Sequence, residues 1–155
     1  MDDIWKQSPF SQVRHVGIIV RDMQPALKKY EALGMGPFQP FSQAVKERRV
    51  RGRVVPEIKL KVMISQLGEI QFELIQPLEG QSPQKEFLDK NGERIHHLGF
   101  FTKDLKGDRD RLVKMGYEVI YSADYVKGGG CDYYINKEHD NEIVWELIEW
   151  PADKS

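Results

Sequence analysis

Two segments of the chain follow the same pattern, one near its start and one in its second half. Residues 15–23 read His-Val-Gly-Ile-Ile-Val-Arg-Asp-Met, and residues 97–105 read His-Leu-Gly-Phe-Phe-Thr-Lys-Asp-Leu. A second pair follows in the same order, because residues 72–76 (Phe-Glu-Leu-Ile-Gln) resemble residues 145–149 (Trp-Glu-Leu-Ile-Glu). Short apolar strands can look alike by chance, but two matched pairs in the same order favour a duplicated structural unit.

The first half predicts one strand, one helix and three further strands. Residues 13–20 are apolar and β-branched, which is typical of a buried strand. Asp22 can cap a helix, apolar residues follow at helical spacing, and Gly34 ends it. The three strands that follow are predicted over residues 45–54, 58–67 and 69–76.

The second half predicts the same order of elements. A strand over residues 97–102 is followed by a helix from Asp104 to Gly116. Three more strands are predicted over residues 117–122, 131–136 and 142–149.

These elements predict an α+β fold of two tandem βαβββ modules in a single domain over residues 1–155. Module 1 spans about 13–77 and module 2 about 96–151, and a linker helix over about 82–92 joins them.

Charge and hydropathy exclude several classes of partner. The formal net charge is -1, so we expect no general attraction to nucleic acid or to a membrane surface. The sequence contains one cysteine, no basic and apolar leader at its start, and no apolar run of roughly 18 residues. We therefore expect a cytoplasmic protein without nucleic-acid or membrane partners.

Each module has a histidine at the start of its first strand and a glutamate in its last strand. These residues are His15, Glu73, His97 and Glu146. If the modules pack around a pseudo-twofold axis, the four side chains can converge on one divalent metal such as Zn, Ni, Co or Mn. Taken singly, a strand histidine is more often a hydrogen-bonded core residue, and a strand glutamate often faces solvent.

The neighbours of the two glutamates favour the metal hypothesis. Strand side chains alternate in direction, so Glu73 shares a face with Ile75, and Glu146 shares one with Ile148. A carboxylate in such surroundings is costly unless it is paired or bound to a metal.

The motifs around these positions resemble the vicinal oxygen chelate superfamily of glyoxalase I, bleomycin-resistance proteins and extradiol dioxygenases. They read His-Val-Gly-Ile from His15, Glu-Leu-Ile-Gln-Pro-Leu from Glu73, His-His-Leu-Gly from His96, and Glu-Leu-Ile-Glu-Trp-Pro from Glu146. The similarity covers about residues 13–151 and is greatest to methylmalonyl-CoA epimerase-like and glyoxalase-like proteins. It implies a cupped, barrel-like mixed sheet around a metal held by His15, Glu73, His97 and Glu146, with His96 outside the ligand set.

The resemblance also implies a reaction and an assembly. Its lyase and isomerase branches remove a proton next to a carbonyl and stabilise a metal-bound enediolate. The substrate would be an α-carbonyl compound, as for a lactoylglutathione lyase, or an acyl thioester, as for an acyl-CoA epimerase. Glu146 is the first candidate for the base and Glu73 the second. Members of the family are commonly homodimers.

Two other functions stay open at this point. A bleomycin-resistance type of protein would bind a drug in the same cup, although such binders usually lack the complete ligand set. An extradiol-type dioxygenase typically uses two histidines and one glutamate, so Glu73 counts against it.

Two features leave the substrate undetermined. The position where some epimerases carry an extra carboxylate base falls on Val62. The basic residues of the segment from Arg48 to Arg53 could contact a substrate anion or could form a solvated edge strand.

Overall fold

The computed structural model of the chain describes residues 8–138 and 140–152. Within this part the strands join into one ten-stranded sheet, in the order β2-β5-β6-β1-β7-β10-β9-β8-β3-β4. The strands are β1 (His15–Ile19), β2 (Gln39–Pro40), β3 (Val45–Val50), β4 (Arg53–Val54), β5 (Lys59–Leu67), β6 (Ile70–Glu79), β7 (Arg94–Phe101), β8 (Tyr117–Tyr125), β9 (Gly130–Asn136) and β10 (Asp140–Glu149). The helices are a short 3-10 helix η1 (Pro9–Ser11) and the α-helices α2 (Met23–Ala32), α3 (Pro83–Asn91) and α4 (Leu105–Lys114).

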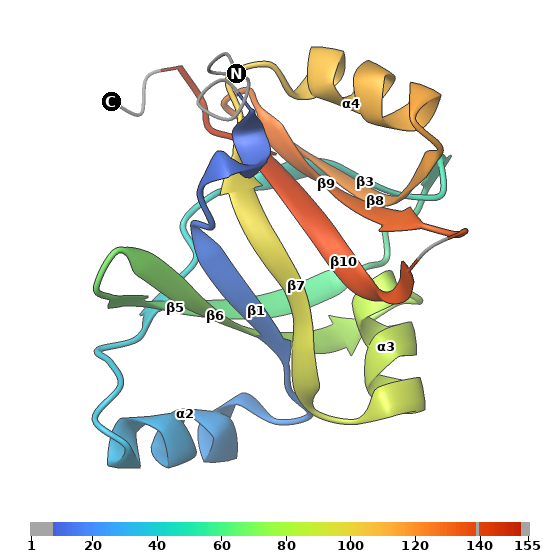
Figure 1. Cartoon of the computed structure of the whole chain (residues 1–155). Coiled ribbons are helices and arrows are strands. Elements are labelled where there is room, and N and C mark those ends of the chain that lie inside the picture. Colours follow the sequence, from blue (N-terminus) through green and yellow to red (C-terminus); the bar gives the residue numbers. More distant parts are fainter. Residues whose placement is uncertain (1–7, 139, 153–155) are drawn as a thin grey trace.

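The centre of the sheet reflects the repeat in the sequence. The first strands of the two modules, β1 and β7, pair antiparallel. On its other side, each pairs in parallel with the last strand of its own module, β1 with β6 and β7 with β10. The sheet curls into a half-barrel, as Figure 1 shows. The α+β fold predicted from the sequence, with its cupped mixed sheet, is confirmed.

The three α-helices begin where the sequence predicts. The side chain of Asp22 accepts a hydrogen bond from a backbone N–H in the first turn of α2, and those of Ser82 and Asp104 do the same for α3 and α4. In Figure 1, α2 and α4 lie at opposite ends of the molecule, outside the curl of the sheet. Their apolar faces cover the outward side chains of the central strands, so the inward side chains are left for a site.

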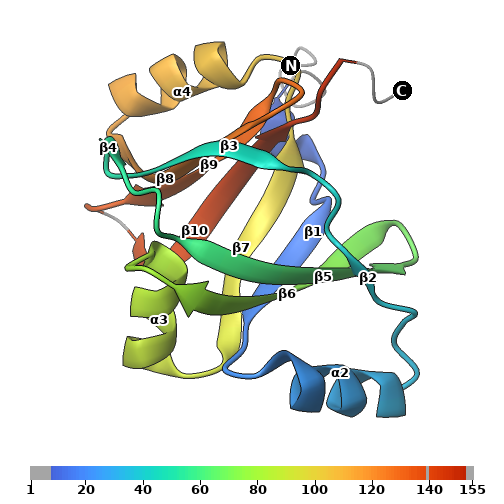
Figure 2. The same cartoon turned by 180° about the vertical axis from the view of Figure 1, so that it is seen from behind.

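One predicted strand is wrong in its extent. The strand predicted over residues 45–54 is divided into β3 and β4 by a turn at Arg51 and Gly52, both of which have positive φ angles. β3 pairs with β4 on one side and with β8 of the second module on the other. The preceding short strand β2 pairs with β5, so the segment from residue 39 to residue 50 runs from one edge of the sheet to the other (Figure 2).

We call residues 39–50 the strap. It crosses the open side of the half-barrel and closes part of the cup. A register irregularity between Val45 and Glu47 changes which of its side chains face inward. Strand propensity did not reveal this path, because the choice of a partner strand is a tertiary property.

Candidate metal centre

Strand register brings the four predicted ligand residues to one place on the inner face of the sheet. Across the central strands, Glu73 lies level with Gly17, and Gly17 lies level with His97. An equivalent row is formed around the glycine of the second module, because His15 lies level with Gly99, and Gly99 lies level with Glu146. We call His15, Glu73, His97 and Glu146 the His/Glu cluster.

The glycine in each row is required by the histidine beside it. A Cβ atom on Gly17 would overlap the ring of His97, and one on Gly99 would overlap the ring of His15. Each imidazole therefore lies over the glycine of the other module, where no other residue leaves room for it. This explains why the two repeats share the pattern His, apolar, Gly.

The ligand atoms of the cluster converge closely. The Nε2 atom of His15 lies 2.6 Å from Oε2 of Glu146, and the Nε2 atom of His97 lies 2.9 Å from the same oxygen. The two Nε2 atoms are 3.1 Å apart. Glu73 lies farther away, with its oxygens 3.9 Å from His15 Nε2 and 3.7 Å from His97 Nε2. All four residues are buried, and one ligand atom of each lies within 4.8 Å of the others.

The donor set fits a divalent metal ion. Two neutral imidazoles and two carboxylates supply two nitrogen and two oxygen ligands, which suits borderline metals such as Zn, Ni, Co or Mn. Two buried carboxylates without a cation would be costly, and a divalent ion balances both charges. The superfamily resemblance implies the same ion at these four residues.

The two carboxylates of the cluster differ in their electrostatic surroundings. Burial raises the pKa of Glu73, and the nearby charge of Glu146 adds to this against the attraction of the two histidines. Burial also disfavours the charge of Glu146, but His97 and His15 outweigh it and hold the pKa of Glu146 well below its usual range. Burial lowers the pKa of His15, but Glu146 and Glu73 outweigh that effect and raise it to about 9. Without a metal, the cluster therefore keeps a proton on His15 beside Glu146.

A third histidine supports the cluster from outside. Nδ1 of His96 lies 3.0 Å from Nδ1 of His97, and its ring packs against Phe87 and Tyr133. Burial, with a contribution from His97, lowers the pKa of His96 well below its usual value, so the ring is neutral. With a metal on Nε2 of His97, its Nδ1–H would donate to Nδ1 of His96. The sequence placed His96 outside the ligand set, but it did not predict this hydrogen bond.

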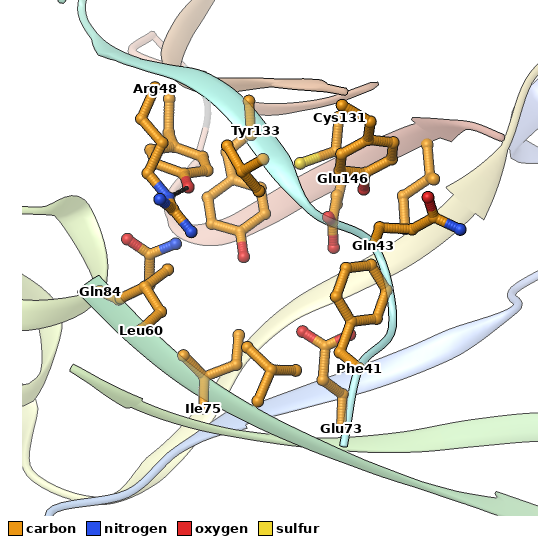
Figure 3. A pocket seen from close by; sticks show the side chains of 16 residues that line it. Phe41, Gln43, Arg48, Leu60, Glu73, Ile75, Gln84, Cys131, Tyr133 and Glu146 are labelled. Atoms are coloured by element: carbon orange, nitrogen blue, oxygen red, sulfur yellow. Dashed lines mark hydrogen bonds between the residues drawn. The ribbon is translucent and has the colours of Figure 1, made fainter. Parts of the chain in front are cut away.

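The cluster opens into a cavity of about 140 Å³, shown in Figure 3. Glu73 and Glu146 line it together with Ile75 and Ile148, as strand alternation predicted. Val62 also lines it, so an apolar side chain occupies the position at which the resemblance suggested an extra base.

Only part of the predicted basic segment reaches the cavity. Arg48 lines it, whereas Arg49 pairs with Asp124 and Arg51 with Glu118 on partly exposed surfaces. Gln84, a polar residue that also lines the cavity, was missed by the sequence analysis because α3 read only as a linker.

Comparison with known proteins places the chain in a family. A sequence profile of the Glyoxalase/Bleomycin resistance protein/Dioxygenase superfamily matches residues 14–135. The chain belongs to this superfamily.

Two curated relatives cover most of the chain. It is 27% identical over 146 residues to the uncharacterized protein YqjC of Bacillus subtilis, covering 93% of this chain and 96% of that protein. It is 30% identical over 115 residues to the ethylmalonyl-CoA/methylmalonyl-CoA epimerase of Cereibacter sphaeroides, covering 73% of this chain and 77% of the relative.

Solved structures share the fold. The methylmalonyl-CoA epimerase of Mycobacterium tuberculosis superposes with a TM-score of 0.66 at 23% identity, covering 92% of this chain and 89% of that one. A Streptomyces coelicolor methylmalonyl-CoA epimerase variant in complex with 2-nitronate-propionyl-CoA gives a TM-score of 0.67 at 22% identity, covering 93% of this chain and 97% of that one. None of the helices in the described part of the chain is long and apolar enough to cross a membrane.

Proposed function

We propose that the protein is a metal-dependent isomerase that removes a proton next to the carbonyl group of a small substrate. The observation that carries this proposal is the complete, buried set of two imidazoles and two carboxylates beside a cavity. The Cereibacter relative, named for ethylmalonyl-CoA and methylmalonyl-CoA, favours an acyl-CoA epimerase over a lactoylglutathione lyase. The fold shared with methylmalonyl-CoA epimerases agrees with this choice.

The metal and the chain have separate tasks in this scheme. When bound, a divalent ion supplies a Lewis acid that polarises the substrate carbonyl and balances the charge of the enediolate. The cavity holds a group about the size of benzene, since an engineered cavity of about 150 Å³ accommodates that molecule. Only the small reacting acyl group would therefore be enclosed, and the remainder of a thioester would extend outside.

Elimination restricts the base to the cluster's carboxylates. Burial raises the pKa of Tyr121, Tyr125, Tyr133 and Cys131, which line the cavity, so all four stay protonated at neutral pH. Arg48 stays charged. Among the titratable side chains that line the cavity, Glu73 and Glu146 are the ones able to accept a proton.

The surroundings of the two carboxylates favour Glu73 as the base. A carboxylate with a raised pKa is the stronger base, and Glu73 is held less closely by the imidazoles than Glu146 is. The sequence favours Glu146, so matched amide variants are needed. Glutamine keeps an oxygen ligand but cannot act as the base.

The test measures metal content and proton exchange together. Wild-type protein, Glu73→Gln and Glu146→Gln are purified without a histidine tag and assayed by elemental analysis. The proteins are then incubated in D2O with methylmalonyl-CoA, or with the hemithioacetal of methylglyoxal and glutathione, and exchange at the carbon next to the carbonyl is followed by NMR.

We expect about one metal per chain in the wild type and metal-dependent exchange with the acyl thioester. Glu73→Gln should keep the metal and lose about a hundredfold or more in exchange rate. Loss of exchange in Glu146→Gln alone, with its metal retained, would assign the base to Glu146 instead. A wild-type protein that takes up no metal would contradict the proposal and leave a small-molecule binding protein. An activity that requires Fe(II) and oxygen would indicate a dioxygenase.

Two further expectations belong with this proposal. We propose a homodimer, since members of the family commonly form one, and sedimentation of the purified protein tests it. The cytoplasmic location stays a prediction.

A further inference from the structure

The cavity has a second polar end, away from the His/Glu cluster. Arg48 and Gln84 both line it. Figure 3 shows these two side chains on one side of the cavity, with Glu73 and Glu146 on the other side. A ligand held at the cluster would therefore have polar groups facing its far end.

Gln84 has no hydrogen-bond partner within the described part of the chain. Its side chain is fully buried, and both amide atoms, Oε1 and Nε2, are unpaired. An unpaired buried amide destabilises a folded protein, so natural proteins rarely keep one without a use for it. Gln84 belongs to the first turn of α3, whose start is fixed by the Ser82 cap and by Pro83. The amide is therefore held in place at the wall of the cavity.

Arg48 carries a charge that the described residues do not neutralise. Its Nε donates to the hydroxyl of Tyr121 at 3.1 Å, and its Nη1 donates to the backbone oxygen of Ile58 at 3.3 Å. Both partners are neutral, and no carboxylate of the described residues lies within 4.0 Å of the guanidinium. The next residue along the strap, Arg49, differs in this respect, because it pairs with Glu47 and Asp124.

The charges of the cavity then favour an anionic ligand. A divalent ion balances the two carboxylates of the His/Glu cluster, which leaves the positive charge of Arg48 without a partner. The N-terminus of the nine-residue helix α3, at which Gln84 lies, favours negative charge as well. A ligand with one negative charge would complete the balance.

We propose that Arg48 and Gln84 form a carboxylate-binding subsite opposite the His/Glu cluster, and that the substrate places a free carboxylate there in addition to the carbonyl group that reacts. This inference rests on the proposed function, because it takes the cluster as the metal centre. The guanidinium and the Gln84 amide group would each donate to the carboxylate. The two residues would then determine which acyl groups the protein accepts.

The test compares ligands that differ only at the far end. Metal-loaded protein is titrated calorimetrically with 2-oxoglutarate and with 2-oxopentanoate, which share a chelating end but differ by the distal carboxylate. The pair 2-oxoadipate and 2-oxohexanoate repeats the comparison with a longer chain. The variants are Arg48→Met and Gln84→Leu, and the matched control is Arg49→Met, which removes the neighbouring arginine on the other side of the strap.

We expect the wild type and Arg49→Met to bind at least one dicarboxylate about tenfold to a hundredfold more tightly than its matched monocarboxylate. Arg48→Met and Gln84→Leu should lose this preference but keep their metal. Gln84→Leu should also unfold at the same temperature as the wild type or a higher one, because it removes an unpaired buried amide. A purely structural role for Gln84 predicts the opposite change in the unfolding temperature.

Other results overturn the inference in distinguishable ways. Equal affinity within both ligand pairs, with the metal retained, would overturn the subsite and leave the metal centre standing. If both Arg48→Met and Gln84→Leu kept the preference for the dicarboxylate, the subsite would likewise be overturned and the metal centre would stand. Failure of the wild type to take up metal, detected before any ligand is added, would overturn the metal centre and this subsite together.

Discussion

The two modules contribute the same residue types to the cluster, but they do not contribute equally. From module 2, Glu146 lies within 3 Å of both imidazoles, and His97 is supported by His96. From module 1, Glu73 lies more than 3.5 Å from either imidazole, and the residue before His15 is Arg14 in place of a second histidine.

This difference separates two tasks that a symmetric site could not separate. Glu146 lies close to both imidazoles and, with His97 and its neighbour His96, gives module 2 the better-supported ligands, which suits holding a metal. Glu73 is held more loosely and has a raised pKa, which suits exchanging a proton. On the proposed function, the repeat would supply four ligands, and the difference in their surroundings would give them different roles.

The largest expected effect comes from removing Glu146. Glu146→Ala should lower metal affinity by more than about a hundredfold, the upper range for losing only an outer partner of a ligand. Glu73→Ala should also lower metal affinity, but by a factor at least about ten times smaller than in Glu146→Ala, because Glu73 is farther from both imidazoles. Competition with a chelator measures both affinities, and Glu79→Ala, on the same strand as Glu73 but exposed, is the control. Equal losses of metal affinity in the two variants would contradict the proposed difference between the modules.

The glycines under the rings should be nearly as sensitive. Gly99→Ala would force the ring of His15 aside, and Gly17→Ala would do the same to His97. Overpacking of this kind costs about 1–3 kcal/mol, and the displaced ligand should weaken metal binding as well. Thermal unfolding with and without metal separates the two effects. The control is Val16→Ala, on the outer face of β1 beside Gly17, which should reduce stability without lowering metal affinity. A lower metal affinity in Val16→Ala would contradict this prediction.

Replacing His96 tests the support for His97 alone. His96→Phe removes the acceptor for Nδ1–H of His97 but keeps an aromatic ring beside Phe87 and Tyr133. We expect a loss of about tenfold to a hundredfold in metal affinity. His96→Asn, which restores an acceptor, should recover part of it. Unchanged affinity in His96→Phe would show that the two histidine ligands are equivalent.

The smallest expected effect is a pH dependence of the metal-free protein. The pKa of His15 rises from 6.5 to about 9 on folding, so its protonated form stabilises the fold fully below about pH 6.5. This contribution is lost as the pH rises from 6.5 through 9. In the presence of a chelator the unfolding temperature should therefore fall between pH 6.5 and 9. His15→Gln should show a smaller fall, and an equal fall in the variant would assign the effect to another group.

Much of the cluster could be predicted because it depends on local rules. Alternation along a strand placed Glu73 beside Ile75 and Glu146 beside Ile148, and the structure has both pairs lining the cavity. The helix starts followed from the capping side chains of Asp22 and Asp104. The repeat suggested that the modules pack around a pseudo-twofold axis, and the pairing of β1 with β7 in the structure brings the four side chains together.

The amino-acid sequence alone was therefore enough to predict the inward-facing His and Glu pattern and the order of the elements, and it contains the glycine that follows each histidine. The path of the strap, the inward position of Arg48, the unpaired amide of Gln84 and the contact of His96 with His97 became visible in the folded structure. The physical reason is the range of the interactions. Side-chain alternation and helix capping act over a few residues, whereas the partner of an edge strand and the contacts of a buried amide depend on segments far apart in the chain.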